Sequence, residues 1–444
     1  METRRQAALC KEAAIHAMTA SAAVRARALE LMAEALAAGA SEIAAANEAD
    51  LRDARDAGLA APLLKRLAYG PEKIELSISG IRSLLGLPDP VGKVLSARLL
   101  DDGLVLRQVA CPIGLVAMIF ESRPDALAQM AALAAKSGCA AMLKGGSEAA
   151  RTNRVLSSLL AGAGLRAGLP EHWLACLETR AQVAELLELD DSVDLVVPRG
   201  SKEFVRSIMS GSRIPVLGHS DGVCHVYLHE DAPAAMAAAL AVDSKAQYPA
   251  ACNAAEVLLV HARFPDRDFA AVLGALQAAG VRLELCPRSR AAAAPALDPN
   301  LISPKDDEDW SVEYLDLRMA VRVVDSLPAA IAHINRYGSR HTDAIVTGSR
   351  EAARAFMAGV DSSSVYWNAS TRFADGYRYG LGAELGIATG KLHARGPVGV
   401  EGLMTYKWEL EGSGQVVADY ASGAKRFVHR DIAIEGRAED AEQG

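Results

Sequence analysis

The chain has 444 residues, of which 51% are apolar and 5% aromatic, and its formal net charge is −8. This length suits two or three domains. No cluster of basic residues stands out in the sequence, which argues against nucleic acid or an anionic membrane as a partner. Seven widely spaced cysteines without a C-x-x-C pair argue against a disulfide framework and a zinc site. The N-terminal segment lacks the apolar core of a signal peptide. We therefore expect a cytoplasmic protein without a membrane span.

The first part of the chain predicts helices followed by a β-hairpin. Residues 5–69 are rich in Ala, Leu and Glu at helical spacing, and another helix begins at Pro71. Two strand-like runs within about 94–110 flank Asp101-Asp102-Gly103. Because Asp-Gly between such runs is typical of a tight turn, this stretch predicts a hairpin.

From residue 113 onwards, strand patterns alternate with helix patterns, which predicts parallel sheets covered by helices. The alternation occurs in two halves, each resembling a doubly wound sheet. The expected strands of the first half are 115–120, 140–143, 173–177, 193–197 and 224–228. Those of the second half are 257–260, 283–285, 319–324, 344–346 and 365–367, followed by a last strand-like stretch at 402–417. Residues after about 425 are charged and are expected to be loose.

Cys252 is the candidate nucleophile. It follows the turn signal Tyr248-Pro249 and two alanines, and it precedes the apolar run Val257–Val260. A cysteine between such a turn and a buried strand has a fixed position, and its small neighbours leave the sulfur accessible. Taken alone, the feature fits a buried structural cysteine better, since most free cysteines are buried small hydrophobes.

The surrounding residues change this balance. The run Lys245-x-Gln247-x-Pro249-x-x-Cys252-Asn253-Ala254-Ala255-Glu256 resembles the nucleophile segment of the gamma-glutamyl phosphate reductase family, a branch of the aldehyde dehydrogenase superfamily. The resemblance covers about residues 5–420 and departs at Tyr248, where many bacterial members have Arg, and in the tail. Further matching segments are Phe120-Glu-Ser-Arg-Pro124, Glu313-Tyr-Leu-Asp-Leu317, Val365–Phe373 and the Gly-rich stretch 380–397.

The resemblance implies an α/β, aldehyde dehydrogenase-like fold with two doubly wound parallel-sheet domains and a small β oligomerisation arm, which contains the hairpin at 94–110. It therefore implies a homo-oligomer, either a dimer or a tetramer. The expected division is an NADP-binding domain at 1–230, a catalytic domain at 231–385, a return to the cofactor domain with an oligomerisation strand at 386–425, and a loose tail at 426–444.

The implied activity is NADPH-dependent reduction of L-glutamyl 5-phosphate to L-glutamate 5-semialdehyde and phosphate through a Cys252 thioester. This is the second step of proline biosynthesis from glutamate. The resemblance also implies functional coupling to glutamate 5-kinase, whose domain this chain has no room to contain. No resident metal is expected.

Two strand ends are candidates for the cofactor. Lys144-Gly145-Gly146-Ser147 places a cation, two glycines and a helix N-cap after a strand, and Gly200-Ser201 follows another strand. An ordinary strand–turn–helix with a surface lysine is the commoner meaning of such a pattern. Neither segment is a full G-x-G-x-x-G fingerprint, so a Rossmann dehydrogenase is not favoured. The resemblance assigns both segments to NADP.

The remaining site residues come from the matching segments. The resemblance places Ser122 and Arg123 at the acyl carbon or the phosphate, together with Cys252 and Asn253 as the catalytic set. It places Glu313 at the nicotinamide ribose, although a solvated acid is the simpler interpretation. A polar cup after the strand at 365–367 is expected to bind the amino-acid substrate; its members are Asn368, Ser370, Thr371 and Arg372.

Two alternative functions remain open. A hydrolytic, NAD(P)-dependent aldehyde dehydrogenase would need a carboxylate base near Cys252, and the segment expected to supply it, 215–222, contains no Glu. A non-catalytic scaffold with the same fold predicts a degraded nucleophile segment. Cys252, Asn253 and Lys144 are all present, which argues against that alternative.

Overall fold

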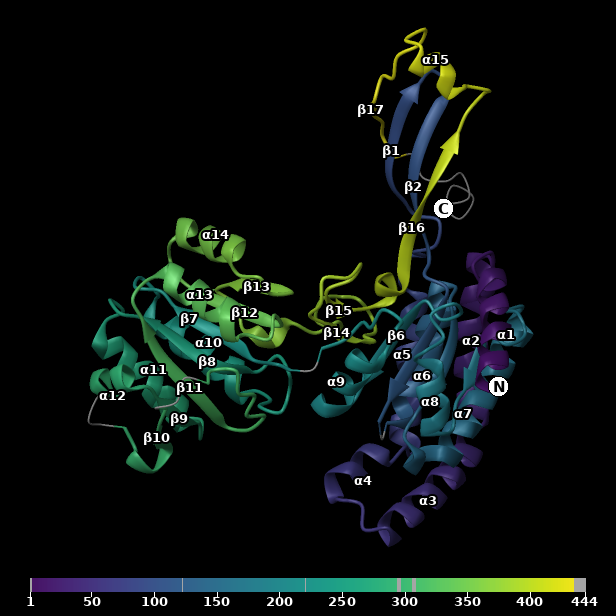
Figure 1. Ribbon diagram of the computed structural model, residues 1–444. Helices are drawn as coiled ribbons and strands as arrows, with labels where there is room; N and C mark the ends of the chain where they lie inside the picture. The colour runs from purple at the N-terminus through teal and green to yellow at the C-terminus, as the bar shows by residue number, and fades with distance from the viewer. Residues whose placement is uncertain (1, 122, 220, 294–296, 306–308, 435–444) are drawn as a thin grey trace. The chain divides into compact units, whose positions relative to one another are not determined.

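The computed structural model describes residues 2–121, 123–219, 221–293, 297–305 and 309–434 (Figure 1). The chain divides into two compact units. Unit 1 comprises Met1–Gly200, Ser207–Val216 and Gly399–Gly444, and unit 2 comprises Ser201–Arg206 and Leu217–Val398. None of the helices within the described ranges is both long and apolar enough to cross a membrane.

The sequence predicts helices over residues 5–69 and one more from Pro71, and the structure has five helices in this part of unit 1. The fifth helix starts at Pro71, where the missing N–H costs no hydrogen bond. The interior of this part is largely Ala and Leu, and the small alanine side chains let the helices approach closely. The helices are α1 (Glu2–Ala17), α2 (Ala22–Ala38), α3 (Ala40–Asp56), α4 (Ala61–Leu67) and α5 (Pro71–Leu85).

The parallel sheet of unit 1 confirms four of the five strands predicted for the first half. Its order is β5-β4-β3-β6. Every residue of β3 and β4 is buried, which explains why these strands are continuous apolar runs. The strands are β3 (Leu115–Phe120), β4 (Ala140–Lys144), β5 (Leu174–Cys176) and β6 (Leu195–Arg199). The intervening elements are α6 (Pro124–Ser137), η1 (Ser147–Ala149), α7 (Ala150–Ala167), α8 (Arg180–Leu186) and α9 (Lys202–Gly211).

A four-stranded antiparallel sheet forms an arm that projects from unit 1 (Figure 1). The predicted hairpin is β1 (Val94–Asp101) and β2 (Leu104–Pro112), and Gly103 between them has a φ of 69°. The outer strands are β16 (Met404–Glu411) and β17 (Arg430–Asp431), in the order β16-β2-β1-β17.

The C-terminal predictions need two corrections. The strand-like stretch 402–417 ends as β16 at Glu411, and the short helix α15 (Val417–Ala421) follows. The tail is not loose throughout, because β17 pairs with β1 and Arg98 Nε donates to Asp431 Oδ1 over 2.7 Å. Residues 435–444 lie outside the described residues.

Unit 2 contains a seven-stranded parallel sheet in the order β10-β9-β11-β8-β7-β12-β13. Its strands are β7 (Cys224–Leu228), β8 (Ala255–His261), β9 (Arg282–Leu285), β10 (Ile302–Pro304), β11 (Arg318–Val324), β12 (Thr342–Val346) and β13 (Ser364–Trp367). Its helical elements are α10 (Ala234–Ala246), α11 (Asp266–Ala278), α12 (Pro287–Ala292), η2 (Pro299–Leu301), α13 (Leu327–Tyr337), α14 (Arg350–Gly359) and η3 (Thr371–Phe373). A small hairpin, β14 (Gly386–Ala388) and β15 (Gly396–Val398), follows, and η4 (Val400–Leu403) begins the return to unit 1.

The predicted boundaries at residues 230 and 385 differ from the observed division. Strand β7 pairs with β8 and β12 at the centre of the second sheet, so it does not complete the first half. Unit 2 accordingly takes in residues from Leu217 and continues through Val398. The overall prediction of two parallel-sheet domains with a β arm is confirmed.

Candidate active site

Cys252 lies in the turn between α10 and β8, at the amino end of the second sheet. The turn is closed by backbone hydrogen bonds from Ala251 to Tyr248 and from Ala254 to Ala251, at 3.3 and 2.9 Å. Gly222, just before β7, packs on this turn so closely that a Cβ there would lie 2.2 Å from the Cys252 carbonyl oxygen. The nucleophile segment is therefore held on rigid backbone, and only glycine fits opposite it.

The Cys252 thiol faces a histidine. Sγ lies 3.2 Å from Nε2 of His341, the fully buried residue just before β12. Burial raises the pKa of the Cys252 thiol to about 12; the Glu384 and Glu313 carboxylates add to this shift, and Arg372 opposes it. Burial holds the His341 pKa well below its usual value. Burial thus favours the neutral form of both groups, a thiol beside an imidazole.

A second histidine, His219, completes a small cluster. Its ring meets that of His341 edge-on at 5.1 Å between centroids, and its Nδ1 donates to the Ile387 carbonyl over 2.7 Å. Candidate ligand atoms of His219, Cys252 and His341 all lie within 4.8 Å of one another, close enough to hold a metal ion. Neither histidine was expected from the sequence. His219 lies in the 215–222 segment, whose lack of Glu is the only feature that the sequence analysis uses.

Two carboxylates lie near the thiol. Glu313 Oε1 accepts the Gly222 N–H over 2.9 Å, and Glu384 Oε2 accepts the Gly376 N–H over 2.7 Å. Burial raises the pKa of Glu313. The contact with Gly222 brings the predicted ribose ligand Glu313 next to the turn that carries Cys252. Sequence reasoning missed Glu384 as a neighbour of the nucleophile, although it lies in a matching segment.

Lys245 and Glu256 flank the nucleophile as a buried ion pair. Both side chains are fully buried, and Lys245 Nζ donates to Glu256 Oε2. Burial raises the pKa of Glu256 to about 7, and Lys245 opposes that shift. The Leu315 N–H donates to the other carboxylate oxygen over 3.2 Å. Because one partner ends α10 and the other lies in β8, the pair fixes both sides of the Cys252 turn.

Asn253 follows the nucleophile and was predicted to be catalytic. The structure shows it 4% exposed, with Nδ2 donating to the Ala374 carbonyl over 2.8 Å. Its Oδ1 is buried without a hydrogen-bond partner among the described residues. The contact seen here ties the Cys252 turn to the segment after η3.

Two of the four residues predicted to bind the substrate, Asn368 and Ser370, form hydrogen bonds within the chain instead. Asn368, with a φ of 54°, bonds the N–H and the carbonyl of Thr347 at 3.0 and 2.9 Å. The Ser370 hydroxyl is buried, contacts Ser244 Oγ and accepts the Arg372 N–H. For these two residues the structure therefore shows a role in shaping the loop.

The other two members of the cup differ. The Thr371 hydroxyl is buried without a partner among the described residues. Arg372 Nε donates to Gln247 Oε1 over 2.9 Å, and its guanidinium lies 5.9 Å from the centre of the Tyr248 ring. Because its charge also lowers the pKa of Cys252, Arg372 is the cup residue that the structure brings to the nucleophile.

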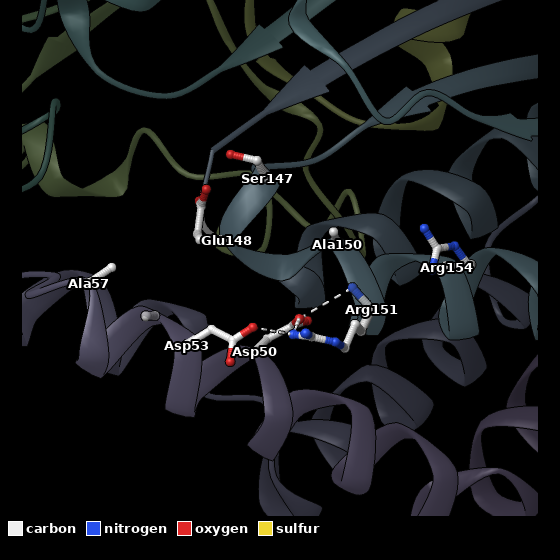
Figure 2. A pocket seen from close by; sticks show the side chains of 9 residues that line it. Asp50, Asp53, Ala57, Ser147, Glu148, Ala150, Arg151 and Arg154 are labelled. Carbon is white, nitrogen blue, oxygen red and sulfur yellow. Dashed lines mark hydrogen bonds and ion pairs between the residues drawn. The ribbon is translucent and has the colours of Figure 1, made fainter.

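In unit 1, Lys144 ends β4 and is 8% exposed. Burial lowers its pKa, and the Glu148 carboxylate opposes that shift. Close by is a cavity of about 490 Å³ between α3 and the start of α7 (Figure 2). Its lining residues are Asp50, Asp53, Ala54, Ala57, Ser147, Glu148, Ala150, Arg151 and Arg154.

Ser147 lines this cavity, but it is not the N-cap that the sequence predicts. It is the first residue of the short turn η1, and α7 begins only at Ala150. The first turn of α7 is capped instead by Asp50 of α3, which accepts the N–H groups of Arg151 and Thr152 at 3.3 and 2.9 Å. A carboxylate of the chain itself thus accepts the N–H groups at the start of α7.

The other predicted residues are placed as follows. Gly200 and Ser201 follow β6 and fall on the two sides of the unit division, and the Ser201 carbonyl accepts the Val205 N–H. Arg123 is exposed and pairs with Asp125 at 3.0 Å. Ser122 lies outside the described residues.

The chain also resembles known proteins. Residues 2–284 match the model of the aldehyde dehydrogenase family. The gamma-glutamyl phosphate reductase of Pelotomaculum thermopropionicum is 52% identical over 97% of this chain and 98% of its own length. That of Acetivibrio thermocellus is 50% identical over 95% and 96%.

Solved structures agree with these relatives. The gamma-glutamyl phosphate reductase of Thermotoga maritima has a TM-score of 0.89 at 35% identity, with 94% of this chain and all of that chain covered. An acetylating aldehyde dehydrogenase from Geobacillus thermoglucosidasius, 19% identical with a TM-score of 0.62 over 94% and 97%, shares the fold. The chain therefore belongs to the aldehyde dehydrogenase family and, within it, to the gamma-glutamyl phosphate reductases.

Proposed function

We propose that this chain reduces L-glutamyl 5-phosphate to L-glutamate 5-semialdehyde with release of phosphate, as the cytoplasmic NADPH-dependent second step of proline biosynthesis. The observation that carries the proposal is the Cys252 thiol, which contacts His341 and whose pKa is lowered by the charge of Arg372. The chain that holds it matches gamma-glutamyl phosphate reductases over nearly its whole length.

The first half of the reaction is acyl transfer to Cys252. The thiol proton passes to Nε2 of His341, 3.2 Å away, as the sulfur attacks the acyl carbon. The bond between that carbon and the phosphate oxygen breaks, phosphate leaves with the electron pair, and a thioester remains. Arg372 favours the developing thiolate, because its positive charge lowers the pKa of the thiol.

The second half is reduction of the thioester. NADPH, when bound, supplies the hydride. The thiohemiacetal then releases the aldehyde, and the Cys252 sulfur takes back the bonding electrons. The rigid turn on Gly222 holds the acyl group in one place through both halves, which avoids the entropic cost of positioning it again.

Lys144, Gly145, Gly146, Ser147, Gly200, Ser201 and Glu313 form the proposed cofactor set. The almost buried Lys144 ammonium at the end of β4 supports a contact with a phosphorylated ribose. It lies near a cavity lined by Ser147, by the carboxylates of Asp50, Asp53 and Glu148, and by two guanidinium groups. Those guanidiniums already pair with acids, Arg151 with Asp50 and Asp53 and Arg154 with Glu178. This leaves Lys144 as our choice for the contact that distinguishes NADPH from NADH.

The arm supports a homo-oligomer. Its edge strand β16 exposes Tyr406, Trp408 and Leu410, each more than half exposed in the single chain. An edge strand with apolar side chains is a surface that proteins ordinarily cover. We propose a dimer or tetramer formed through the arm, and a functional coupling to glutamate 5-kinase as the supplier of the acyl phosphate.

A coupled assay tests the function. The full-length protein is mixed with glutamate, ATP, NADPH and glutamate 5-kinase, and NADPH oxidation is followed. We expect NADPH oxidation that requires all components. A reaction without this protein serves as the blank, and after the blank is subtracted one phosphate should be released for each NADPH consumed. An unchanged NADPH signal with active kinase and folded protein would refute the proposed substrate.

Lys144→Ala is expected to raise the KM for NADPH about 10- to 100-fold and to change the KM for NADH much less. The lost contact is a charge-assisted hydrogen bond to the 2′-phosphate, worth roughly 1.5–3 kcal/mol. Steady-state kinetics with both cofactors measure the effect. Lys136→Ala, which removes an equally buried ammonium elsewhere in unit 1, is the control for loss of stability. Equal changes in both KM values would show that Lys144 does not recognise the 2′-phosphate.

A further inference from the structure

The cluster of His219, Cys252 and His341 has the composition of a soft-metal site. It offers one thiol sulfur and two imidazole nitrogens, with all candidate ligand atoms within 4.8 Å of one another. A tetrahedral zinc ion with bonds of about 2.0–2.3 Å holds such atoms roughly 3.4–3.6 Å apart. The Sγ to Nε2 distance of 3.2 Å between Cys252 and His341 is already close to that value.

We propose that His219, Cys252 and His341 bind Zn²⁺, and that the bound ion blocks the nucleophile reversibly. The inference rests on the proposed function only for its inhibitory consequence, because binding itself depends on the three side chains. Formation of the Zn–S bond releases the thiol proton to solvent and changes no oxidation state. The fourth tetrahedral position is left for water.

The histidines are oriented as zinc ligands are. In metal sites the second ring nitrogen of a ligating histidine usually bonds a carbonyl, a carboxylate or another fixed group. Here His219 Nδ1 donates to the Ile387 carbonyl over 2.7 Å, and His341 Nδ1 lies 2.8 Å from Thr342 Oγ1. The His219 contact fixes the tautomer in which Nε2 carries the lone pair.

The surrounding charges are balanced in favour of a cation. The Glu313 and Glu384 carboxylates place negative charge near the Cys252 sulfur and raise the pKa of its thiol, whereas the positive charge of Arg372 lowers it. The ligand types select the metal: thiolate with imidazole prefers Zn²⁺ over Mg²⁺ or Ca²⁺, which take oxygen ligands. The cluster therefore predicts sensitivity to zinc but not to the magnesium that accompanies ATP.

His219 separates metal binding from catalysis, because it is a ligand of the proposed metal site but takes no part in the proposed reaction. We expect His219→Gln and His219→Asn to retain reductase activity and to bind Zn²⁺ at least ~10-fold more weakly than the wild-type protein. His172→Gln is the matched control, because His172 is half exposed and pairs with Glu171. It should leave both properties unchanged.

Binding is measured on the full chain without substrates, by competition for Zn²⁺ with a chromogenic chelator. Wild-type protein should take up one ion per chain, and bound Co²⁺ should show a thiolate charge-transfer band that Cys252→Ser abolishes. Bound Zn²⁺ should also protect Cys252 from iodoacetamide until EDTA is added. Failure of folded wild-type protein to bind the ion, or unchanged affinity in both folded His219 variants, would overturn the proposal. These readouts do not depend on reductase activity, so a failure of the proposed function is distinguishable.

Discussion

Cys252→Ser is expected to lower reductase turnover at least ~10³-fold while the fold survives, because a hydroxyl replaces the sulfur that we propose forms the acyl intermediate. The substitution keeps the size of the side chain nearly unchanged. The close packing at this turn is between Gly222 and the backbone of Cys252, so it does not depend on the sulfur. The coupled forward assay measures turnover, and thermal unfolding reports the fold.

Cys224→Ser and Cys139→Ser are the controls. Each of these buried thiols donates to a backbone carbonyl, Cys224 to Cys252 at 3.3 Å and Cys139 to Leu403 at 3.4 Å. A serine hydroxyl can replace either donor, so both variants should stay active. Near-wild-type turnover in Cys252→Ser would rule out the covalent mechanism.

Local patterns predicted the helices and strands well, because buried segments need apolar residues at a regular spacing that is visible in the sequence. The apolar run Leu115–Phe120 is observed as β3 with the same bounds, and Asp-Gly correctly predicts the turn between β1 and β2. Strand β7 shows the limit of such patterns. Its composition identifies a buried strand, but only its pairing with β8 and β12 decides which sheet contains it.

The site was predictable where chemistry is local in sequence and unpredictable where it is assembled across the chain. Cys252 became the candidate nucleophile only when the family resemblance of its neighbours was added to its turn and strand. His341 and His219 approach it only because β8, β7 and β12 are neighbours in the sheet. Ser147 was mistaken for a helix cap because the real cap, Asp50, comes from α3. Asn368 looked like a ligand because sequence does not reveal its bonds to Thr347.

The second large effect concerns the reverse of the proposed reaction, in which NADP oxidises glutamate 5-semialdehyde and the acyl group is left on Cys252 as a thioester. We expect this reaction to require inorganic phosphate. Water would need a general base to attack the thioester, and the described part of the 215–222 segment, which includes Gly222 at the nucleophile, contains no Glu. The nearby Glu313 and Glu384 carboxylates each hold a backbone N–H through one oxygen, and we expect neither to act as the base.

Phosphate needs less assistance, because it is already an anionic nucleophile. The positive charge of Arg372 acts on the Cys252 sulfur, and we propose Arg372 as the cation that binds phosphate there. Absence of phosphate should therefore stop the cycle at the acyl-enzyme after a single turnover. The expected product is L-glutamyl 5-phosphate, with one phosphate consumed for each NADP reduced.

The phosphate dependence of NADP reduction is thus the most direct test of the proposed acyl transfer. Initial rates are measured with freshly prepared semialdehyde, which cyclises spontaneously, at several phosphate concentrations and with Cys252→Ser as the blank. The account predicts a single burst of NADPH without phosphate, and a steady rate that rises to saturation as phosphate is added. Sustained turnover to free glutamate in phosphate-free buffer would contradict it and would identify a hydrolytic dehydrogenase instead.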